Sequence, residues 1–461
     1  MCFIVVMRRS AMSAVRSFCT RVSLPRLLSV TPASSMIDSK LDIKATGLEA
    51  NSSVTIRSVL EQETRNGVVK FEGHAHYIAD DRGVVSVPDQ RSLGGTYNVG
   101  NISRQDADPM GLLWSMLPSP GQRFGARIVC KDVTKPMTVH LSLHGGHLDT
   151  MTLQTAEPEA TTTAERWYMG QNVERITVHS GRLRGSVFKP KGPGPFPGVI
   201  DMYGSTGGLI ETRAAILAYH GLACYALPYF KYDDLPSQMW NLELEYFKEA
   251  IDWMADQPFV KPGGIAMVGI SIGAQNVLAT VSQFPEKVKA VVSISGAHVY
   301  TSFPMTLNGE ALPFVEFDFG GIKSSASTDG AQDMFDCYKG VYDVKEEEGV
   351  IFKLENAPNC KFLFIVGDSD RLWDSCHYAQ QAIQRLERHG CHNHQLLSYP
   401  NAGHLIEVPY VPASGVSFSA FLGNVVDHGG TVKGTAQANE DSWPKIVKFL
   451  HKCCGSDYSK L

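Results

Sequence analysis

The chain has no run of about 20 consecutive apolar residues, so the sequence predicts no membrane-spanning helix. Its net charge is also small, −5 over 461 residues, and gives no reason to expect a nucleic-acid partner. The ten cysteines form no C-x-x-C pair, which favours a reducing compartment over a disulfide framework. With 43% hydrophobic and 19% charged residues, a chain of this length predicts a globular protein of two domains with tails.

Acidic residues are absent from the first 37 positions, which are rich in Arg, Ser and Thr. This composition is typical of a mitochondrial presequence, and residues 1–38 are interpreted as a leader, either targeting or disordered. The tail, residues 456–461, ends in Ser459-Lys460-Leu461, a tripeptide that the peroxisomal import receptor recognises. The sequence therefore predicts a peroxisomal protein, with the mitochondrial matrix as the alternative location.

Residues 40–156 predict an antiparallel β-sandwich, because short alternating segments are separated by turn residues. The expected strands include Val54 to Leu60, His74 to Ile78, Ala126 to Cys130 and Met137 to Leu143. The apolar segment Asp108 to Met116 is expected to form a helical turn over one sheet. Nothing in this domain suggests catalysis. Three histidines without an acidic or thiol partner beside them are interpreted as structural rather than metal-binding: His140, His144 and His147.

Residues 157–175 are interpreted as a polar linker, and residues 176–455 as a second domain in which strands alternate with helices. Such alternation predicts a mostly parallel sheet with helices on both faces. The helix expected from Leu242 to Met254 has a clear apolar face, and the strand expected from Val288 to Ile294 is apolar enough to be central. Residues 303–359 break the alternation and are expected to cross the end of the sheet and cap a pocket.

The segment Gly264 to Gln275 has the pattern of a nucleophile elbow, in which an apolar strand turns through Gly-x-Ser-x-Gly into a helix. In this turn the serine, Ser271, occupies a strained tip with its hydroxyl exposed. Side chains at Gly269 and Gly273 would collide with the neighbouring backbone. Ser271 is therefore the candidate nucleophile.

A serine hydroxyl needs a general base, and the base needs an acid to orient it. In α/β-hydrolases the chain order is Ser, acid, His, with the acid and histidine on loops after later strands. His404 follows the strand predicted from Gln395 to Tyr399 and is the candidate base. Asp368 and Asp370 both follow the strand predicted from Lys361 to Val366, and the residues alone do not decide between them.

The oxyanion of such a reaction needs backbone N–H donors. One is expected at Ile272, directly after the nucleophile and at the positive end of the next helix. The other is expected in the loop after the strand that ends at Tyr203, where Gly204, Ser205 and Gly207 are candidates. This loop lacks the Gly-Lys-Ser/Thr ending of a phosphate-binding loop, so nucleotide binding is not expected there.

The sequence around these candidate residues resembles one family, the type I acyl-CoA thioesterases and the bile acid-CoA:amino acid N-acyltransferases. The resemblance covers about residues 40–455. It rests on segments that occur in the family's order: Asp108 to Met116, Gly194 to Asp201, Gly204 to Leu209, Gly269 to Ala274, Phe362 to Gly367 and Tyr399 to Tyr410.

The resemblance implies a β-sandwich followed by an α/β-hydrolase domain that acts on fatty acyl-CoA through an acyl-enzyme. Coenzyme A is then part of the substrate, and no separate cofactor or metal is implied. The family's Gly-x-x-Asp loop falls on Asp370 and selects it over Asp368. Serine as nucleophile goes mainly with hydrolysis, so Ser271 favours a thioesterase. Transfer of the acyl group to glycine or taurine is the alternative, because Val292 to Gly296 and Ala402 to Glu407 look closer to the acyltransferase branch.

Overall fold

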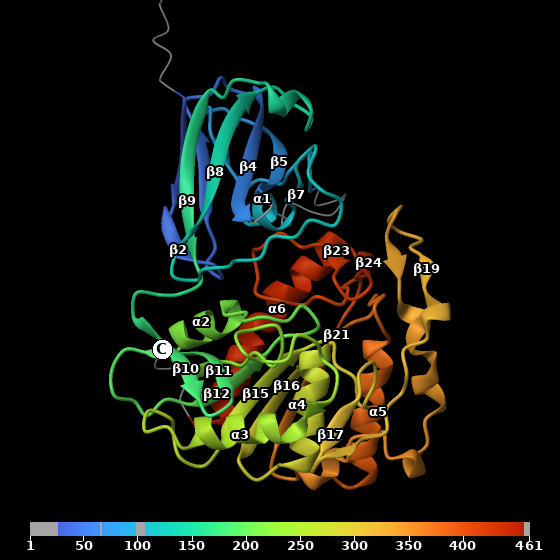
Figure 1. Ribbon diagram of the computed structural model, residues 1–461. Coiled ribbons are helices and arrows are strands. Elements are labelled where there is room, and N and C mark those ends of the chain that lie inside the picture. The colour runs from blue at the N-terminus through green and yellow to red at the C-terminus, as the bar shows by residue number, and fades with distance from the viewer. Residues whose placement is uncertain (1–25, 65–66, 98–106, 456–461) are drawn as a thin grey trace, which may run out of the picture.

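A computed structural model of the protein describes residues 26–64, 67–97 and 107–455. Most of the predicted leader and the whole Ser-Lys-Leu tail lie outside the described residues. Two domains are visible in Figure 1, a β-sandwich above and a larger α/β domain below. Among the described residues, no helix is both long and apolar enough to cross a membrane.

The first domain is the β-sandwich that the sequence predicts, antiparallel except for the parallel pairing of β2 with β9. Its larger sheet has the order β2-β9-β8-β4-β5-β7 and its smaller sheet the order β1-β3-β6. The buried turn α1 (Gly111–Trp114) packs between them, where Leu112 O accepts a hydrogen bond from Ser58 Oγ. The strands are β1 (Leu27–Thr31), β2 (Ser34–Met36), β3 (Asp42–Thr46), β4 (Ser53–Thr64), β5 (Gly67–Ile78), β6 (Val85–Ser86), β7 (Leu117–Pro118), β8 (Met137–Gly145) and β9 (Ala160–Trp167), with a short helix η1 (Thr152–Gln154) before β9.

Two domain boundaries and one strand of the sequence prediction differ from the structure. Strands β1 and β2 lie inside the predicted leader, and β9 lies inside the predicted linker. The polar composition of β9 does not indicate a strand, because its inward-facing residue, Arg166, is a buried arginine. Its guanidinium donates to Ser35 Oγ and to the carbonyls of Ile37 and Ser39. The strand predicted at residues 126–130 is instead an irregular segment that reaches toward the second domain.

The second domain is an α/β-hydrolase sheet with the order β10-β11-β13-β12-β15-β16-β21-β22. Strand β11 pairs antiparallel with both neighbours, and every pairing from β13 to β22 is parallel. The strands are β10 (Val173–Ser180), β11 (Leu183–Pro190), β12 (Gly198–Met202), β13 (Ala223–Ala226), β15 (Ile265–Ile270), β16 (Val288–Ile294), β21 (Lys361–Gly367) and β22 (His394–Tyr399). The helices are α2 (Thr212–Tyr219), α3 (Leu244–Ala255), α4 (Ile272–Gln283), α5 (Ser375–Arg388) and α6 (Val432–Cys453).

Helices cover both faces of this sheet, so each face has its own apolar core (Figure 1). Side chains of α3, α4 and α5 pack on one face, against Met267 and Val291 among others. Those of α2 and α6 pack on the other face, against Ala266 and Val292. Because successive residues of a strand point to opposite faces, the apolar runs of β15 and β16 serve both cores.

Residues 303–359, here called the cap segment, cross the carboxyl end of the sheet as predicted. The segment contains β17 (Met305–Leu307), β18 (Glu310–Ala311), η2 (Phe319–Gly321), β19 (Lys323–Ser324), β20 (Gln332–Asp333), η3 (Phe335–Asp343), η4 (Glu346–Glu348) and η5 (Leu354–Asn356). Strands β19 and β20 join the hairpin of β23 (Val416–Ser419) and β24 (Asn424–Asp427) in a four-stranded sheet. Strand β14 (Leu242–Glu243) pairs with β17.

Candidate active site

Ser271 lies at the tip of a sharp turn between β15 and α4. Its φ and ψ are 58° and −130°, a conformation that residues other than glycine rarely adopt and that is typical of strained functional turns. A Cβ on Gly269 would lie 2.5 Å from Gly273 O, and one on Gly273 would lie 2.5 Å from Met202 O. Both glycines are therefore required by close backbone approach, as the sequence predicts for a nucleophile elbow.

The structure brings the three predicted side chains together at the carboxyl ends of the parallel strands β15, β21 and β22. His404 Nε2 lies 2.8 Å from Ser271 Oγ, and His404 Nδ1 lies 2.8 Å from Asp370 Oδ2. The side chains of His404 and Asp370 are only 1% and 2% exposed. With Nδ1–H donating to Asp370, Nε2 is free to accept the serine proton, which is the arrangement that makes a serine hydroxyl nucleophilic.

The two candidate aspartates have different neighbours. Asp370 Oδ2 contacts the histidine while Oδ1 accepts from Leu372 N at 2.9 Å, so this carboxylate is held in one orientation. Asp368 Oδ1 instead accepts from Asn401 N at 2.7 Å and thereby joins the acid loop to the histidine loop. These contacts agree with the choice of Asp370 as the orienting acid. Asp368 instead connects the two loops.

His404 is enclosed by groups that sequence reasoning did not select. The Trp373 ring packs edge-on against it at 5.6 Å, and the His428 ring stacks on it at 6.3 Å. His404 N donates to His428 O at 2.8 Å. Burial lowers the pKa of His428 well below its ordinary value, so this imidazole is neutral beside that of His404.

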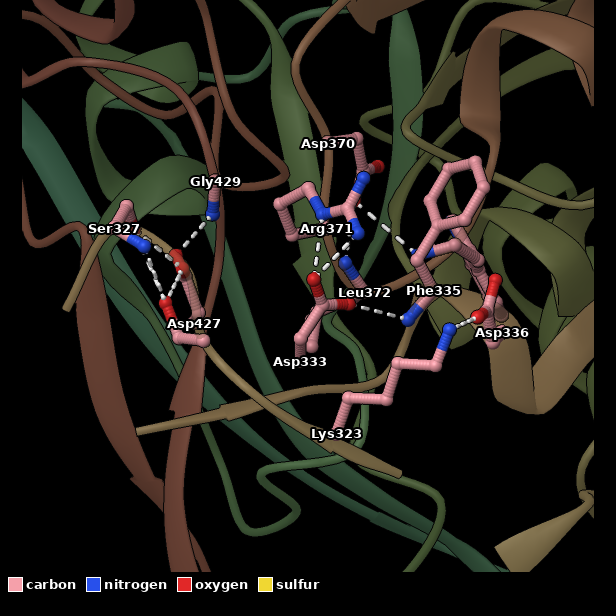
Figure 2. A network of polar contacts seen from close by, with 12 residues as sticks. Lys323, Ser327, Asp333, Phe335, Asp336, Asp370, Arg371, Leu372, Asp427 and Gly429 are labelled. Carbon is pink, nitrogen blue, oxygen red and sulfur yellow. Dashed lines mark hydrogen bonds and ion pairs between the residues drawn. The ribbon is translucent and has the colours of Figure 1, made fainter. Parts of the chain in front are cut away.

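The cap segment is tied directly to the acid loop (Figure 2). Arg371, the residue after Asp370, donates from Nε to Asp333 Oδ2 of β20 at 2.8 Å. On the other side, Asp427 Oδ2 of β24 accepts from Ser327 Oγ at 2.7 Å, and its Oδ1 accepts from Gly429 N. Residues of the four-stranded sheet therefore hold the loops that carry the acid and the base.

The predicted oxyanion loop lies against Ser271. A Cβ on Gly204 would be 2.9 Å from Ser271 Cβ, so the Gly204 backbone approaches the serine closely. Gly204 and Ser205 line the same cavity as Ser271 and Ile272. Gly207 does not line that cavity; it faces the ring of Phe230, so the structure gives no support to its predicted oxyanion role.

Two sets of buried contacts hold this loop and the strand before it in place. Tyr229 Oη donates to Tyr203 O at 2.6 Å and to Gly204 O at 3.2 Å. Asp201, at the end of β12, pairs with Arg213, and both side chains are at most 2% exposed. Burial raises the pKa of Asp201, although the Arg213 charge opposes this effect. No local sequence pattern indicates the Tyr229 and Asp201–Arg213 contacts, because each joins residues that are separated in the chain.

A cavity of about 160 Å³ opens at Ser271. Its lining includes Arg127 of the first domain and Glu407, three residues after His404, and these two side chains form an ion pair. Burial alone would lower the pKa of Arg127, but the charge and hydrogen bond of Glu407 raise it. Both residues also line a smaller pocket of about 60 Å³ between the domains. Both domains therefore contribute to the site.

The described residues contain no group of three or more His, Cys, Asp or Glu that could hold a metal ion. His147 Nε2 donates to Tyr77 O at 3.0 Å, and His144 Nε2 lies 2.9 Å from Ser142 Oγ. These two predicted structural histidines thus have partners within the sandwich.

The sheet order, the elbow after β15 and the acid and base loops after β21 and β22 define an α/β-hydrolase that carries an N-terminal β-sandwich. Residues 38–180 match the acyl-CoA thioester hydrolase/BAAT N-terminal region, and residues 242–456 match the BAAT/acyl-CoA thioester hydrolase C-terminal region. The chain belongs to this family.

Three curated relatives illustrate the family's range, and each is 36% identical to this chain. Mouse acyl-coenzyme A amino acid N-acyltransferase 1 matches over 94% of this chain and 99% of its own length. Human mitochondrial acyl-coenzyme A thioesterase 2 matches over 91% and 82%. Mouse peroxisomal succinyl-coenzyme A thioesterase matches over 94% and 98%.

Proposed function

We propose that this protein hydrolyses fatty acyl-CoA to a free acid and coenzyme A, with Ser271 as nucleophile, His404 as general base and Asp370 as the orienting acid. The observation that carries the proposal is the continuous contact from Ser271 Oγ through His404 to Asp370, 2.8 Å at each step. Membership of a family that contains thioesterases supports the substrate class.

The reaction has two halves. Ser271 Oγ attacks the thioester carbonyl while His404 takes its proton, and the Ile272 N–H, with donors from Gly204 and Ser205, stabilises the oxyanion. The C–S bond breaks, and His404 gives the proton to the coenzyme A sulfur. Water then attacks the acyl-enzyme, loses a proton to His404, and Ser271 regains its hydroxyl. Coenzyme A enters as part of the substrate, and no other cofactor takes part in this scheme.

The testing experiment is a panel of acyl-CoAs on which thiol release and product identity are followed together. Wild-type protein should release coenzyme A and free acid, and Ser271→Ala should lose this turnover while keeping the wild-type unfolding transition. A folded Ser271→Ala variant with most of the wild-type rate would reject the nucleophile. The absence of hydrolysis by wild type on every member of the panel would reject the thioesterase itself.

Transfer of the acyl group to an amino acid is the second candidate. It is supported by the N-acyltransferase among the relatives and by the sequence of Ala402 to Glu407. Repeating the panel with glycine and taurine separates the two reactions, because conjugates accumulate only if an amine resolves the acyl-enzyme. Ser271→Cys is the companion variant: a higher ratio of conjugate to free acid than in wild type would favour an acceptor site.

For localisation, the proposal is import into the peroxisome through Ser459-Lys460-Leu461, with the mitochondrial matrix as the alternative. Relatives named for each compartment support both alternatives. A fluorescent fusion at the N-terminus should colocalise with a peroxisomal marker and become diffuse when Leu461 is deleted. Unchanged localisation after the deletion would reject this signal. A second fusion at the C-terminus, which leaves the Arg-rich N-terminus free, tests the mitochondrial alternative.

A further inference from the structure

A continuous series of aromatic rings runs from the base of the proposed triad to the protein surface. The His404 ring contacts Trp373 at 5.6 Å between ring centres, and Trp373 contacts Tyr338 at 5.4 Å. Tyr338 in turn contacts Phe317 at 5.3 Å, and Phe317 contacts Phe319 at 4.8 Å. Three of these rings belong to the cap segment, so the cap supplies the outer part of the series.

A second row of rings lies beside the first and borders the cavity at Ser271. Phe303 and Phe421 both line that cavity and contact each other at 5.3 Å. Phe421 also contacts Phe317 at 5.8 Å and Phe319 at 6.2 Å, which joins the two rows. We call the combined surface the aromatic wall, formed by Trp240, Phe303, Phe317, Phe319, Tyr338 and Phe421.

The wall contains both buried and exposed rings. Phe303 and Phe317 are 7% and 9% exposed, whereas Phe421 and Phe319 are 41% and 62% exposed. A contiguous group of exposed aromatic rings usually marks a surface that binds something apolar. Because the inner end of this group borders Ser271, a molecule bound covalently to the serine can extend onto it without a break.

Charge distinguishes the two sides of the cavity. Its Arg and Glu lining residues, Arg127 and Glu407, also line the pocket between the domains, whereas Phe303 and Phe421 do not. An apolar chain that entered the interdomain pocket would cover this ion pair and lose the apolar contacts that the aromatic wall offers. A hydrocarbon chain is therefore expected to bind on the side of the cavity that Phe303 and Phe421 line.

We propose that the acyl chain of the thioester leaves Ser271 between Phe303 and Phe421 and lies along the aromatic wall, which makes the wall the determinant of acyl-chain length. This inference rests on the proposed action on acyl-CoA. Carbons near the carbonyl contact Phe303 and Tyr338, and only the far end of a long chain reaches Phe319. The site therefore favours long acyl chains over short ones.

Two single substitutions test the direction of the chain. Phe421→Ala should lower kcat/KM for medium- and long-chain acyl-CoAs, and Phe319→Ala should lower it only for the longest chains. For each affected substrate, kcat/KM should fall about 10-fold, because roughly two methylene groups of the acyl chain would be left uncovered. Phe319→Ala should turn over butyryl-CoA within about two-fold of wild type, because a four-carbon chain does not reach Phe319. Phe124→Ala is the matched control, because Phe124 is also a surface phenylalanine, 47% exposed, and does not line this cavity.

The outcomes separate this inference from the proposed function. If wild type hydrolyses the panel but both variants keep its chain-length profile, the acyl chain lies elsewhere and only the inference fails. An unchanged profile with lost sedimentation on phosphatidylcholine vesicles would assign the wall to a lipid surface and overturn the proposal. An unchanged profile with a smaller mass in solution would assign it to a second copy of this chain, which also overturns it. If wild type hydrolyses nothing, the failure is that of the proposed function.

Discussion

Arg371 joins the loop of the proposed catalytic acid to the cap segment through its ion pair with Asp333. Arg371 Nε lies 2.8 Å from Asp333 Oδ2 (Figure 2). Arg371 O accepts from Met334 N at 3.2 Å. Asp370 precedes Arg371 directly, so the ion pair holds the residue next to the carboxylate that contacts His404. Cap and triad are therefore coupled through two adjacent residues.

Arg371→Leu tests this coupling. We expect kcat to fall about 10-fold with a smaller change in KM, because a loosened acid loop lowers the fraction of correctly oriented imidazole. Lys323→Leu is the matched control: Lys323 is paired with Asp336 of the same segment but does not contact the acid loop. Steady-state kinetics on one acyl-CoA give kcat and KM for both variants. Equal effects of the two substitutions would show that the Arg371–Asp333 pair stabilises the cap segment without orienting Asp370.

The assignment of the acid predicts unequal effects at two neighbouring aspartates. Asp370→Asn should lower kcat about 10⁴-fold, because an amide in place of the carboxylate no longer favours the Nδ1–H tautomer of His404. Asp368→Asn should cost less than about 10-fold, since Asp368 contacts the Asn401 backbone and not the histidine. Rates and circular dichroism spectra of both variants provide the comparison, and a reversed order would move the acid to position 368.

The sequence was sufficient for the parts of the site whose signals are local. The elbow is specified by Gly269, Ser271 and Gly273 within five positions, and its collisions follow from backbone geometry alone. His404 follows from chain order after a strand. By contrast, Arg127 and Glu407 are 280 positions apart, and no local pattern pairs them. Their contact depends on how the domains pack, which periodicity does not encode.

The misplaced fold boundaries have a related cause. Composition led to the interpretation of residues 1–38 as a leader, yet Ser35 there accepts a hydrogen bond from buried Arg166 of β9. A strand whose inward residue is a buried arginine does not show the apolar alternation by which strands are recognised. The polar partners that make it stable lie more than a hundred positions away and become apparent only in the folded chain.

The ion pair between Arg127 and Glu407 should couple the two domains energetically. Both side chains are largely buried, 23% and 20% exposed, so removal of one leaves the other poorly solvated. We expect Arg127→Met and Glu407→Gln each to destabilise the protein, and the double variant to be less destabilised than the sum by about 2 kcal/mol. Urea unfolding of the four proteins gives this coupling energy. Additive effects would mean that the pair contributes little.

Gly204→Ala should abolish most activity without unfolding the protein. The added Cβ would lie 2.9 Å from Ser271 Cβ and 3.3 Å from Oγ, so the methyl group occupies the space beside the nucleophile. We expect kcat/KM to fall at least about 100-fold, the scale of losing an oxyanion donor. Gly415→Ala is the control, because a Cβ there meets nothing within 4 Å. A serine-reactive fluorophosphonate probe should label the Gly415 variant normally and the Gly204 variant slowly; equal labelling would contradict the predicted crowding.

Buried His298 should make the protein sensitive to acid. Burial, together with the nearby charges of His377 and Arg385, lowers the pKa of His298 to about 3, and its Nδ1 has no hydrogen-bond partner. Between pH 6.5 and 3 the unfolded chain binds a proton here that the folded protein does not, so stability falls as the pH falls through this window. From pH 7 to 5 the loss from this one group should be about 2 kcal/mol. Urea unfolding at the two pH values should show a smaller loss for His298→Leu than for wild type, and no such difference for the exposed control His392→Leu. An identical pH dependence of wild type and His298→Leu would mean that His298 takes up its proton over the same pH range in the folded protein as in the unfolded chain.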